Sequence, residues 1–313
     1  MLRYTALRLL AAIPTLLIVS AAVFLLVRLA PGDPATLMLG DAASPEAVAR
    51  IRARWGLDQP LAVQFWRWLS AALQGDLGMS MRNGVPVTEL VLARAMVTAP
   101  IVILAVAIAA ALAVPLGLFA AARQNRAGDF VVVAAATLFL SIPSFWLGLM
   151  LLLVFGMQLG WAPVVGYVSI LEDPLAALGY IVLPVATLVL AEFGLLIRMM
   201  RASAVETMRL DYVTHARAKG LDERTVFRRH VMPNAFGPTW TMIGLVLGSL
   251  LGGAAVVETV FTIPGLGRLL VDAIFARDYA VIQGCLLLVA VLYVLVNLAF
   301  DLVLPVFDPR VRR

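Results

Sequence analysis

The sequence contains few charged residues and almost no lysine, histidine or cysteine. Of its 313 residues, 14% are Asp, Glu, Lys or Arg, against about 25% in an average soluble domain. Lys219 is the only lysine, His215 and His230 are the only histidines, and Cys285 is the only cysteine. One thiol excludes an internal disulfide and a cysteine-rich metal site, and two histidines argue against a histidine-rich metal site. We interpret Cys285, which lies in an apolar run, as a small packing residue.

The chain also lacks the common catalytic and nucleotide-binding motifs. It contains no H-E-x-x-H and no G-x-S-x-G. A P-loop requires Gly-Lys-Ser/Thr, because its lysine reaches the phosphates and its hydroxyl binds magnesium, whereas Lys219 precedes Gly220. A Walker A site is therefore excluded. We predict no catalytic residue, no metal site and no cofactor in this chain, so that ATP and magnesium, if used, are bound by a partner subunit.

Long apolar runs dominate the rest of the chain. Hydrophobic residues make up 62% of it, and an apolar helix of about 20 residues crosses a hydrocarbon core about 30 Å thick. The pattern therefore predicts an all-α polytopic membrane protein. The first run follows Arg3 and Arg8, and it is longer than a typical signal peptide core, so we interpret it as a retained helix. Six segments meet the required length: Leu9–Leu29, Thr98–Ala122, Phe130–Gly156, Leu178–Met200, Thr239–Val260 and Ile282–Phe307.

Positive charges between the runs predict the orientation. Arginine or lysine residues gather before the first run, between the second and third, between the fourth and fifth, and after the sixth. The connection between the third and fourth runs has none and carries Glu172 and Asp173. The positive-inside rule therefore places both termini in the cytoplasm. Several arginines in the long first connection do not change this prediction, because long loops report orientation weakly.

The long first connection, residues 31–97, is predicted to fold outside the membrane. Ser44 is a good N-cap and Pro45 suits the first helical position, which predicts a helix that ends at Gly56. Asp58 is expected to start a second helix. The apolar side chains of that helix form either a small core with an interfacial aromatic belt or a docking surface for an external partner; they are Phe65, Trp66, Trp68 and Leu69.

Prolines interrupt several of the runs, and bent helices can line a path through a membrane protein. The alternative for each such residue is ordinary helix packing, in which neighbouring helices satisfy the carbonyls that a proline frees. The segment "SIPSFW" is the best path candidate. The candidate path residues are Ser141, Pro143, Ser144 and Glu192.

Three acidic residues lie within the predicted spans, where ionisable groups are costly and often functional. Glu192 is deep in the fourth run, which suggests either proton coupling or a hydrogen bond within the bundle. Glu258 and Asp301 lie near span ends. For these two we expect interfacial placement or a local partner.

The stretch Thr214–Pro233, "THARAKGLDERTVFRRHVMP", concentrates charge between the fourth and fifth runs. Asp211 can cap a short helix that Gly220 ends by taking a positive φ. Asp222 can cap a second short helix, which we expect Pro233 to end. Two short helices between membrane spans suit a docking element better than a linker.

Small residues in this stretch support the docking interpretation. Ala216, Ala218 and Gly220 have small or no side chains, so we expect one face without bulky side chains, which a partner can approach closely. The alternative is ordinary positive charge at a cytoplasmic surface. That alternative explains the charges, but not the small residues, the glycine or the second cap.

The same stretch resembles the cytoplasmic loop of ABC-importer permeases, E-A-A-x-x-x-G followed after nine residues by I-x-L-P. Aligned on Gly220, the second alanine (Ala216) and the proline (Pro233) agree, whereas Thr214, His215 and His230 replace the Glu, the first Ala and the Ile. The variant "DYVTHARAKGL" is similar to the form found in B-type dipeptide/oligopeptide permeases. By this resemblance, the ATPase-coupling residues are Asp211, Tyr212, Ala216, Arg217, Ala218, Lys219, Gly220, Leu221 and Pro233.

The resemblance covers nearly the whole chain. Its further motifs are "PGDP" at Pro31–Pro34, "WGLDQPL" at Trp55–Leu61, "GDLGMSM" at Gly75–Met81, "SIPSFWLG" at Ser141–Gly148, "ETVFTIPGLGRLL" at Glu258–Leu270 and "DPRVR" at Asp308–Arg312. The implied fold is the six-helix type I importer permease. The implied organisation is a first helix in 1–30, a folded external segment in 31–97, a permease core in 92–307 with a coupling loop at 201–235, and a cytoplasmic tail at 308–313.

The resemblance also implies a function and partners. The chain would be a multi-pass subunit of the bacterial cytoplasmic (inner) membrane that translocates short peptides. Its partners would be a second homologous permease, two cytoplasmic ABC ATPase subunits or domains, an extracytoplasmic solute-binding protein and membrane lipid, with no nucleic acid. The family also includes nickel and glutathione permeases, which remain alternatives. A proton-coupled secondary transporter using Glu192 and a structural or assembly protein are the alternatives from other classes.

Overall fold

The computed structural model describes residues 2–29, 36, 44–170 and 172–307, and the regular elements of these residues are helices. Four of the predicted spans lie in the long helices α1 (Leu2–Leu29), α5 (Val87–Ala122), α8 (Pro174–Met208) and α14 (Tyr279–Phe307). Glu223–Gly252, which contains most of α11 (Met232–Gly253), is a fifth candidate span, and a bent helix pair makes the sixth. The all-α class with six spans is therefore confirmed. The motifs at 31–34 and 308–312 lie outside the described residues.

The third span is sharply bent where a proline interrupts its apolar run. It consists of α6 (Ala127–Ser141) and α7 (Ser144–Leu151), and α7 continues as a π-helical segment, Leu152–Gln158. The two halves meet at 97°. Pro143 disfavours helical geometry at the preceding residue, and Ile142 is accordingly extended, with φ −89° and ψ 124°. The predicted span Phe130–Gly156 therefore consists of two helices that are broken at Pro143, the proline that interrupts this run in the sequence.

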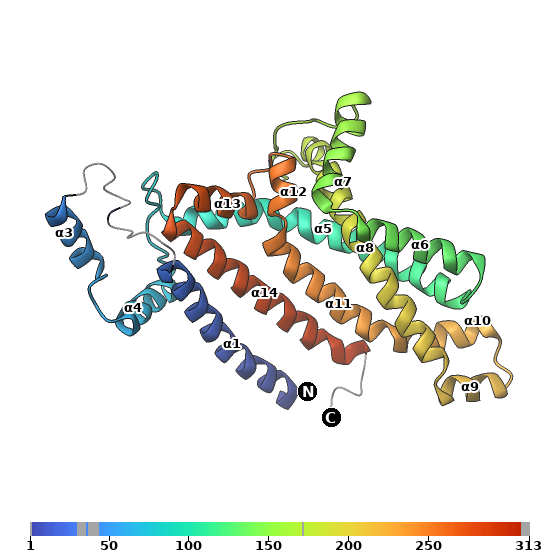
Figure 1. The fold of residues 1–313 in the computed structure, drawn as a ribbon. Coiled ribbons are helices and arrows are strands. Elements are labelled where there is room, and N and C mark those ends of the chain that lie inside the picture. Colours follow the sequence, from blue (N-terminus) through green and yellow to red (C-terminus); the bar gives the residue numbers. More distant parts are fainter. Residues whose placement is uncertain (1, 30–35, 37–43, 171, 308–313) are drawn as a thin grey trace.

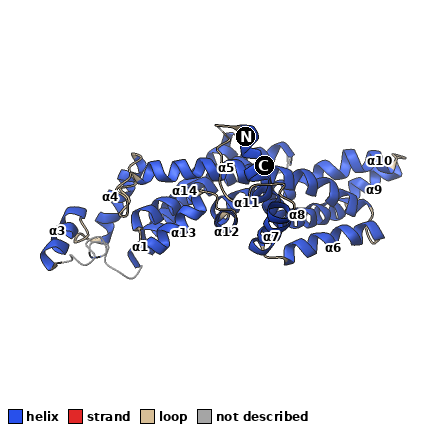
Figure 2. Cartoon of the chain, turned by 90° about the horizontal axis from the view of Figure 1, so that it is seen from above, coloured by secondary structure: helices blue, strands red, loops and turns tan. Residues whose placement is uncertain are grey.

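The helices form a bundle in which α5 packs along α8 and α14 lies between α1 and α11 (Figure 1). The largest buried apolar cluster joins α5, α8 and α11, and includes Val102, Leu196 and Val246. Figure 2 shows the same helices from above, with α3 and α4 at one end and α9 and α10 at the other. Elements α9 and α10, which connect α8 to α11, therefore lie far from the external segment.

Three glycines let α11 approach α14 closely. They are spaced four residues apart and so lie on one face of α11. A Cβ at each would lie within 3 Å of a side chain on α14, which is closer than side chains normally come. Small residues in this spacing are a common device of membrane helix packing. The pairs, with the distance from the Cβ to the nearest side-chain atom, are Gly244 with Phe300 (2.6 Å), Gly248 with Tyr293 (2.7 Å) and Gly252 with Val289 (2.8 Å).

The segment that is predicted to be external, residues 31–97, contains the two helices that the sequence predicts, but only the first begins as expected. Helix α3 spans Pro45–Trp55, the Ser44 hydroxyl accepts from the Ala47 amide, and Gly56 is left-handed with φ +65°. Helix α4 spans Leu61–Leu73 and begins after Pro60. Asp58 is therefore not its cap, because Pro60 fixes the chain before the first helical turn.

The aromatic side chains of α4 divide between a small core and an exposed surface. The ring centroids of Phe65 and Trp68 lie 5.6 and 5.9 Å from that of Phe24 on α1. Leu69 is also buried, whereas the Trp66 side chain is 61% exposed. The interpretation as a small core is thus confirmed for Phe65, Trp68 and Leu69.

The fifth span ends earlier than predicted. Helix α11 stops at Gly253, and a separate short helix, α12 (Ala255–Val260), follows it. Helix α13 (Leu266–Ala276) then precedes α14. The predicted span Thr239–Val260 is therefore shifted toward the N-terminus, because the apolar run continues through a turn at Ala254 that composition does not reveal.

The two ends of the chain meet at one end of the bundle. The Tyr4 hydroxyl donates to the Asp301 carbonyl at 3.0 Å, and Arg8 Nη1 lies 2.7 Å from Asp301 Oδ2. Figure 1 shows the start of α1, the end of α14 and the α9–α10 connection at this end, opposite α3, α12 and α13. This arrangement agrees with the prediction that these three parts share the cytoplasmic side.

Candidate functional site

The candidate site begins where α8 ends and the chain turns into α9. Helix α9 spans Asp211–Ala218, with Leu210 as its N-cap residue and no side-chain cap. Asp211 is therefore the first helical residue, where its charge complements the helix dipole, and the prediction that it caps the helix is wrong. Gly220 takes φ +79° just after the helix, as the sequence predicts.

The second half of the site is capped as expected but does not end as expected. The Asp222 carboxylate accepts from the Thr225 amide at 3.1 Å and starts α10 (Glu223–Val226). Hydrogen bonds from the side chain and the backbone of Thr225 lower the pKa of Asp222. A π-helical segment, Phe227–Val231, then leads directly into α11. Pro233 does not end a helix, because it lies in the first turn of α11, where proline is tolerated.

A small apolar core, which we call the loop cluster, holds α9 and α10 on the bundle. Val213, Val226 and Val231 are completely buried, and Ala216 is only 6% exposed. Ala216 therefore faces the protein interior, and the expectation that it lies on an open face without bulky side chains is wrong, because Val213 sets the phase of α9. The loop cluster connects α9 and α10 to the ends of α5, α8 and α11; its members are Leu118, Ala121, Met200, Ala204, Val213, Ala216, Val226, Val231 and Ala235.

Polar contacts join the two short helices to each other and to α8. Arg217 Nε lies 2.7 Å from Glu223 Oε1, and Arg217 Nη1 donates to the Met208 carbonyl at 3.4 Å. The Tyr212 hydroxyl donates to the His230 carbonyl at 3.4 Å. Arg217 and Tyr212 are thus placed to hold the connection together.

The exposed face of α9 is different from the one that the small residues suggested. Asp211, Thr214, His215 and Ala218 are all exposed, at the spacing of one helix face, and the Leu221 side chain is 40% exposed beyond them. Lys219, Gly220 and Pro233 are also exposed. Thr214 and His215 were not among the predicted coupling residues. The 3.6-residue period of α9, counted from the apolar Val213 as the buried position, places Thr214 and His215 on the exposed face and would have identified them.

An ion pair close to the loop cluster links α8 to α6. Arg201 Nε and Nη2 lie 2.5 and 2.6 Å from the two carboxylate oxygens of Asp129, and the Asn125 amide donates to the same carboxylate at 3.0 Å. A bidentate arginine–carboxylate pair fixes orientation as well as distance. The end of α8 and the start of α6 are therefore held together beside α9.

The candidate path residues lie on α8 and around the bend between α6 and α7. Ser141, Pro143 and Ser144 surround the bend between α6 and α7, and the Ser141 hydroxyl donates to the Thr137 carbonyl. Glu192 lies on α8 and is half-buried, next to the point where the α8 glycine Gly194 packs against α6. Within the described part of the chain, no hydrogen bond or ion pair joins Glu192 to the serines.

The other two intramembrane carboxylates have local partners, as expected. Asp301 pairs with Arg8. Glu258, which is 3% exposed, accepts from the Thr98 hydroxyl at 2.6 Å and from the Arg268 amide at 2.8 Å. The Thr98 oxygen in turn accepts from the Leu266 amide at 2.8 Å. This carboxylate therefore joins α12, α5 and the start of α13. Cys285 is completely buried, as its interpretation as a packing residue requires.

Two family descriptions match the chain, and together they cover nearly all of it. Residues 113–313 match the family described as "Binding-protein-dependent transport system inner membrane component". Residues 1–102 match its N-terminal counterpart, "Binding-prot-dependent transport system membrane comp, N-term". The first match contains the bend at Pro143, the candidate path residue Glu192 on α8 and the whole α9–α10 connection.

Relatives of the same length support these matches. A putative peptide transport system permease protein of Brucella abortus (strain 2308) is 43% identical over 301 residues, which are 96% of either chain. The glutathione transport system permease protein GsiC of Salmonella paratyphi A is 43% identical over 312 residues, covering 100% of this chain and 99% of the relative. A crystal structure of an amino acid ABC transporter covers 71% of this chain at 19% identity, and its TM-score of 0.47 is too low to support the fold by itself. The chain belongs to the family of binding-protein-dependent transport system inner membrane components.

Proposed function

We propose that the chain translocates short peptides and that the α9–α10 connection is where an ATPase subunit drives it. As an inner membrane component of a binding-protein-dependent system, it is a non-catalytic permease that works with a binding protein and an ATPase. A second, homologous permease would complete the channel. The observation that carries the coupling proposal is the exposed face of α9, which is held on a buried apolar cluster at the end of α8.

The contacts around α9 suggest how movement reaches the membrane. A displacement of α9 acts on α8 through the loop cluster, in which Val213 packs with Met200 and Ala204. The Asp129–Arg201 pair carries the same displacement to α6. Helix α6 ends at the bend that contains Pro143. The bend is therefore the part of the path that we expect to respond to ATP.

The peptide substrate is proposed from the relatives' names. One relative is called a peptide permease and another a glutathione permease, at the same 43% identity. Glutathione is itself a small peptide, so both names share a substrate with amide bonds and terminal charges. We favour short peptides in general, with glutathione or nickel as the alternatives to test.

The coupling proposal is tested at Gly220. Non-glycine residues rarely take its φ of +79°, asparagine tolerates it best, and a β-branched residue is an outlier that costs about 1–2 kcal/mol. A Cβ at this position meets no atom of the chain within 4 Å, so the effect comes from the backbone or from a partner. We expect Gly220→Val to reduce ATPase co-purification and ATP-driven uptake, and Gly220→Asn to retain more of both.

Arg224→Ala, on an exposed side chain outside α9, is the matched control and should change little. All variants should be purified from membranes with their partner subunits and compared for bound ATPase at equal permease amounts. Normal ATPase binding and normal uptake by Gly220→Val would leave this connection as a simple positive-inside anchor.

The substrate and the role of Glu192 are tested together in proteoliposomes that contain the complete importer. Uptake of a labelled dipeptide, glutathione and Ni²⁺ would each be measured with and without ATP. We expect ATP-dependent peptide uptake that Glu192→Gln leaves largely intact. Loss of uptake in Glu192→Gln with normal assembly and normal ATP hydrolysis would instead favour proton coupling.

A further inference from the structure

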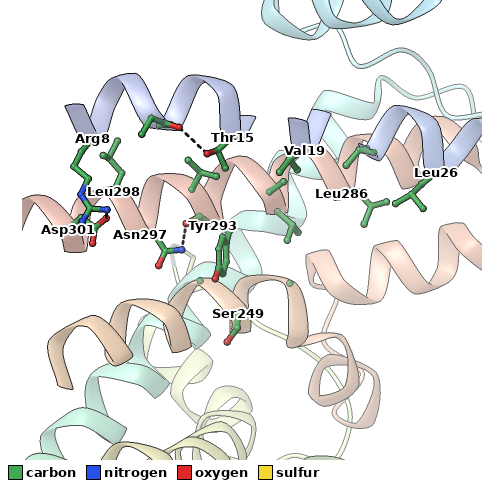
Figure 3. A pocket seen from close by; sticks show the side chains of 18 residues that line it. Arg8, Thr15, Val19, Leu26, Ser249, Leu286, Tyr293, Asn297, Leu298 and Asp301 are labelled. Carbon is green, nitrogen blue, oxygen red and sulfur yellow. Dashed lines mark hydrogen bonds and ion pairs between the residues drawn. The ribbon is translucent and has the colours of Figure 1, made fainter. Parts of the chain in front are cut away.

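An open groove runs along the membrane-spanning part of the bundle, between α1 and α11. Helix α14 forms its floor, α1 forms one wall, and Gly248, Ser249 and Gly252 on α11 form the other (Figure 3). Its volume is about 640 Å³. The groove lies away from Ser141, Pro143 and Glu192, none of which lines it. It is therefore separate from the candidate path.

The lining of the groove changes in a fixed order along its length. At the cytoplasmic end, Arg8 and Asp301 form an ion pair at 2.7 Å. Hydrogen-bonding side chains follow. At the helical rise of 1.5 Å per residue, Thr15 lies about 10 Å along α1 from Arg8, and Asn297 lies about 6 Å along α14 from Asp301. Beyond Tyr293, the lining is apolar as far as Leu26 except for Ser249, whose hydroxyl donates to the Val246 carbonyl of its own helix (Figure 3).

The hydrogen-bonding side chains keep free capacity toward the groove. The Thr15 hydroxyl donates to the Ala11 carbonyl and the Asn297 amide nitrogen donates to the Tyr293 carbonyl, both on their own helices. The Asn297 amide oxygen and the Tyr293 hydroxyl have no partner in the described part of the chain. Free polar groups at this depth favour an occupant that has hydrogen-bonding groups at the same depth.

We propose that the groove binds one phospholipid of the cytoplasmic leaflet with a phosphoethanolamine headgroup. The negative phosphate would lie beside Arg8 and the positive ammonium beside Asp301. Each charge of the protein's ion pair would then face a headgroup charge of opposite sign. The ester groups would lie near Asn297 and Thr15. One acyl chain would follow the apolar part, whose length suits a leaflet about 15 Å thick.

Charge selects this headgroup over the other common ones. An anionic headgroup without an ammonium would place its charge beside the Asp301 carboxylate, where like charges repel. A choline headgroup carries a positive charge but cannot donate a hydrogen bond to that carboxylate. An ethanolamine ammonium can do both, as a lysine ammonium does.

The order of the lining also argues against a transmembrane helix of a second permease as the occupant. Such a helix is apolar in its middle and polar at both ends. The groove is charged at one end only and is apolar at its external end, around Leu26 and Leu286. This polarity matches an amphiphile that enters from one leaflet.

The experiment measures lipid bound to the full-length chain in its purified importer complex. After removal of loosely bound lipid, the complex would be mixed with equal amounts of phosphatidylethanolamine, phosphatidylcholine and phosphatidylglycerol, and bound lipid would be counted by native mass spectrometry. We expect a preference of about tenfold for phosphatidylethanolamine over phosphatidylglycerol, the effect of one charge-assisted hydrogen bond. Asp301→Asn should abolish or reverse this preference.

Two substitutions on α1 separate the groove from the general lipid surroundings. Ala12 lines the groove, whereas its neighbour Ile13 is 55% exposed and does not line it. Ala12→Phe should fill the groove and reduce the bound phosphatidylethanolamine about tenfold, and Ile13→Phe should leave it unchanged. This comparison does not depend on the transported substrate or on ATPase docking.

Three outcomes would overturn the proposal. One is equal binding of the three lipids by the unsubstituted complex, and another is an identical effect of Ala12→Phe and Ile13→Phe. The third combines two results: the unsubstituted complex binds no lipid, and the Ala12→Phe complex loses the second permease. Together they would show that a protein helix occupies the groove.

Discussion

The external end of the bundle and the α9–α10 connection are held in place by different forces. At the external end, α12, α13 and α5 meet around the buried carboxylate of Glu258, which accepts from Thr98 and from the Arg268 amide. At the cytoplasmic end, α9 and α10 rest on an apolar cluster that contains Val213, and their charged groups are mostly exposed.

This difference suggests a division of labour between the ends. Buried hydrogen bonds to a charged group fix both distance and direction, and they are costly to leave unmade. Apolar packing is non-directional, so it tolerates small shifts of one helix over another. We therefore expect the external end to act as the fixed point of the bundle and the α9–α10 connection to move with the ATPase. Three substitutions test this comparison.

Glu258→Ala should have the largest effect. It leaves the Thr98 hydroxyl and the Arg268 amide without their acceptor in a buried site. At 1–3 kcal/mol for each unsatisfied group, we expect a loss of about 4 kcal/mol of stability. Thermal denaturation of the purified chain in detergent would measure it. Val256→Ala on the exposed side of α12 is the control, and an equally stable Glu258→Ala protein would contradict the fixed-point interpretation.

Val213→Ala should have an intermediate and local effect. The substitution removes about two methyl groups from a fully buried site, which costs about 2 kcal/mol when a cavity remains. We expect α9 to loosen, with less co-purified ATPase but a normal melting temperature for the membrane bundle. Thr214→Ala, on the exposed face next to it, tests contact with the partner instead. A global loss of stability in Val213→Ala would show that the two ends are not independent.

Asp222→Ala should have the smallest effect. It removes the cap of α10, which costs about 1 kcal/mol. Asp222→Ser keeps a capping oxygen and should behave like the unsubstituted chain. Protease sensitivity of the connection in membrane vesicles is a suitable measurement, because only local unfolding is expected. Equal sensitivity of the two variants would mean that the loop cluster alone holds α10.

Most of the membrane topology could be predicted because apolar length is a property of the sequence alone. The errors arise where the backbone turns inside an apolar run. Pro143 indicates an interruption but not its sharp angle, and the turn at Ala254 leaves composition unchanged, so neither shortens the apolar run. Pro233 was expected to stop a helix, but the sequence does not show that a π-helical segment would carry the chain into α11.

The candidate site was predicted in part, for similar reasons. Gly220 and Asp222 act through their own backbone and side chain, so their roles could be inferred locally. The burial of Ala216 depends on which side of α9 packs against α8 and α5, which only the tertiary structure fixes. The groove along α14 depends on helices that are far apart in the sequence, so no local pattern indicates it.

The contact between Arg8 and Asp301 also has a consequence for the order of biosynthesis. Helix α1 packs mainly on α14, the last span to be made. At a synthesis rate of about 5–20 residues per second, α1 waits about 15–60 s before Asp301 leaves the ribosome. During that interval α1 lacks its main neighbour, and among the described helices α4 is another that packs against it. A nascent chain that stops before α14 therefore leaves its first helix without its main protein neighbour.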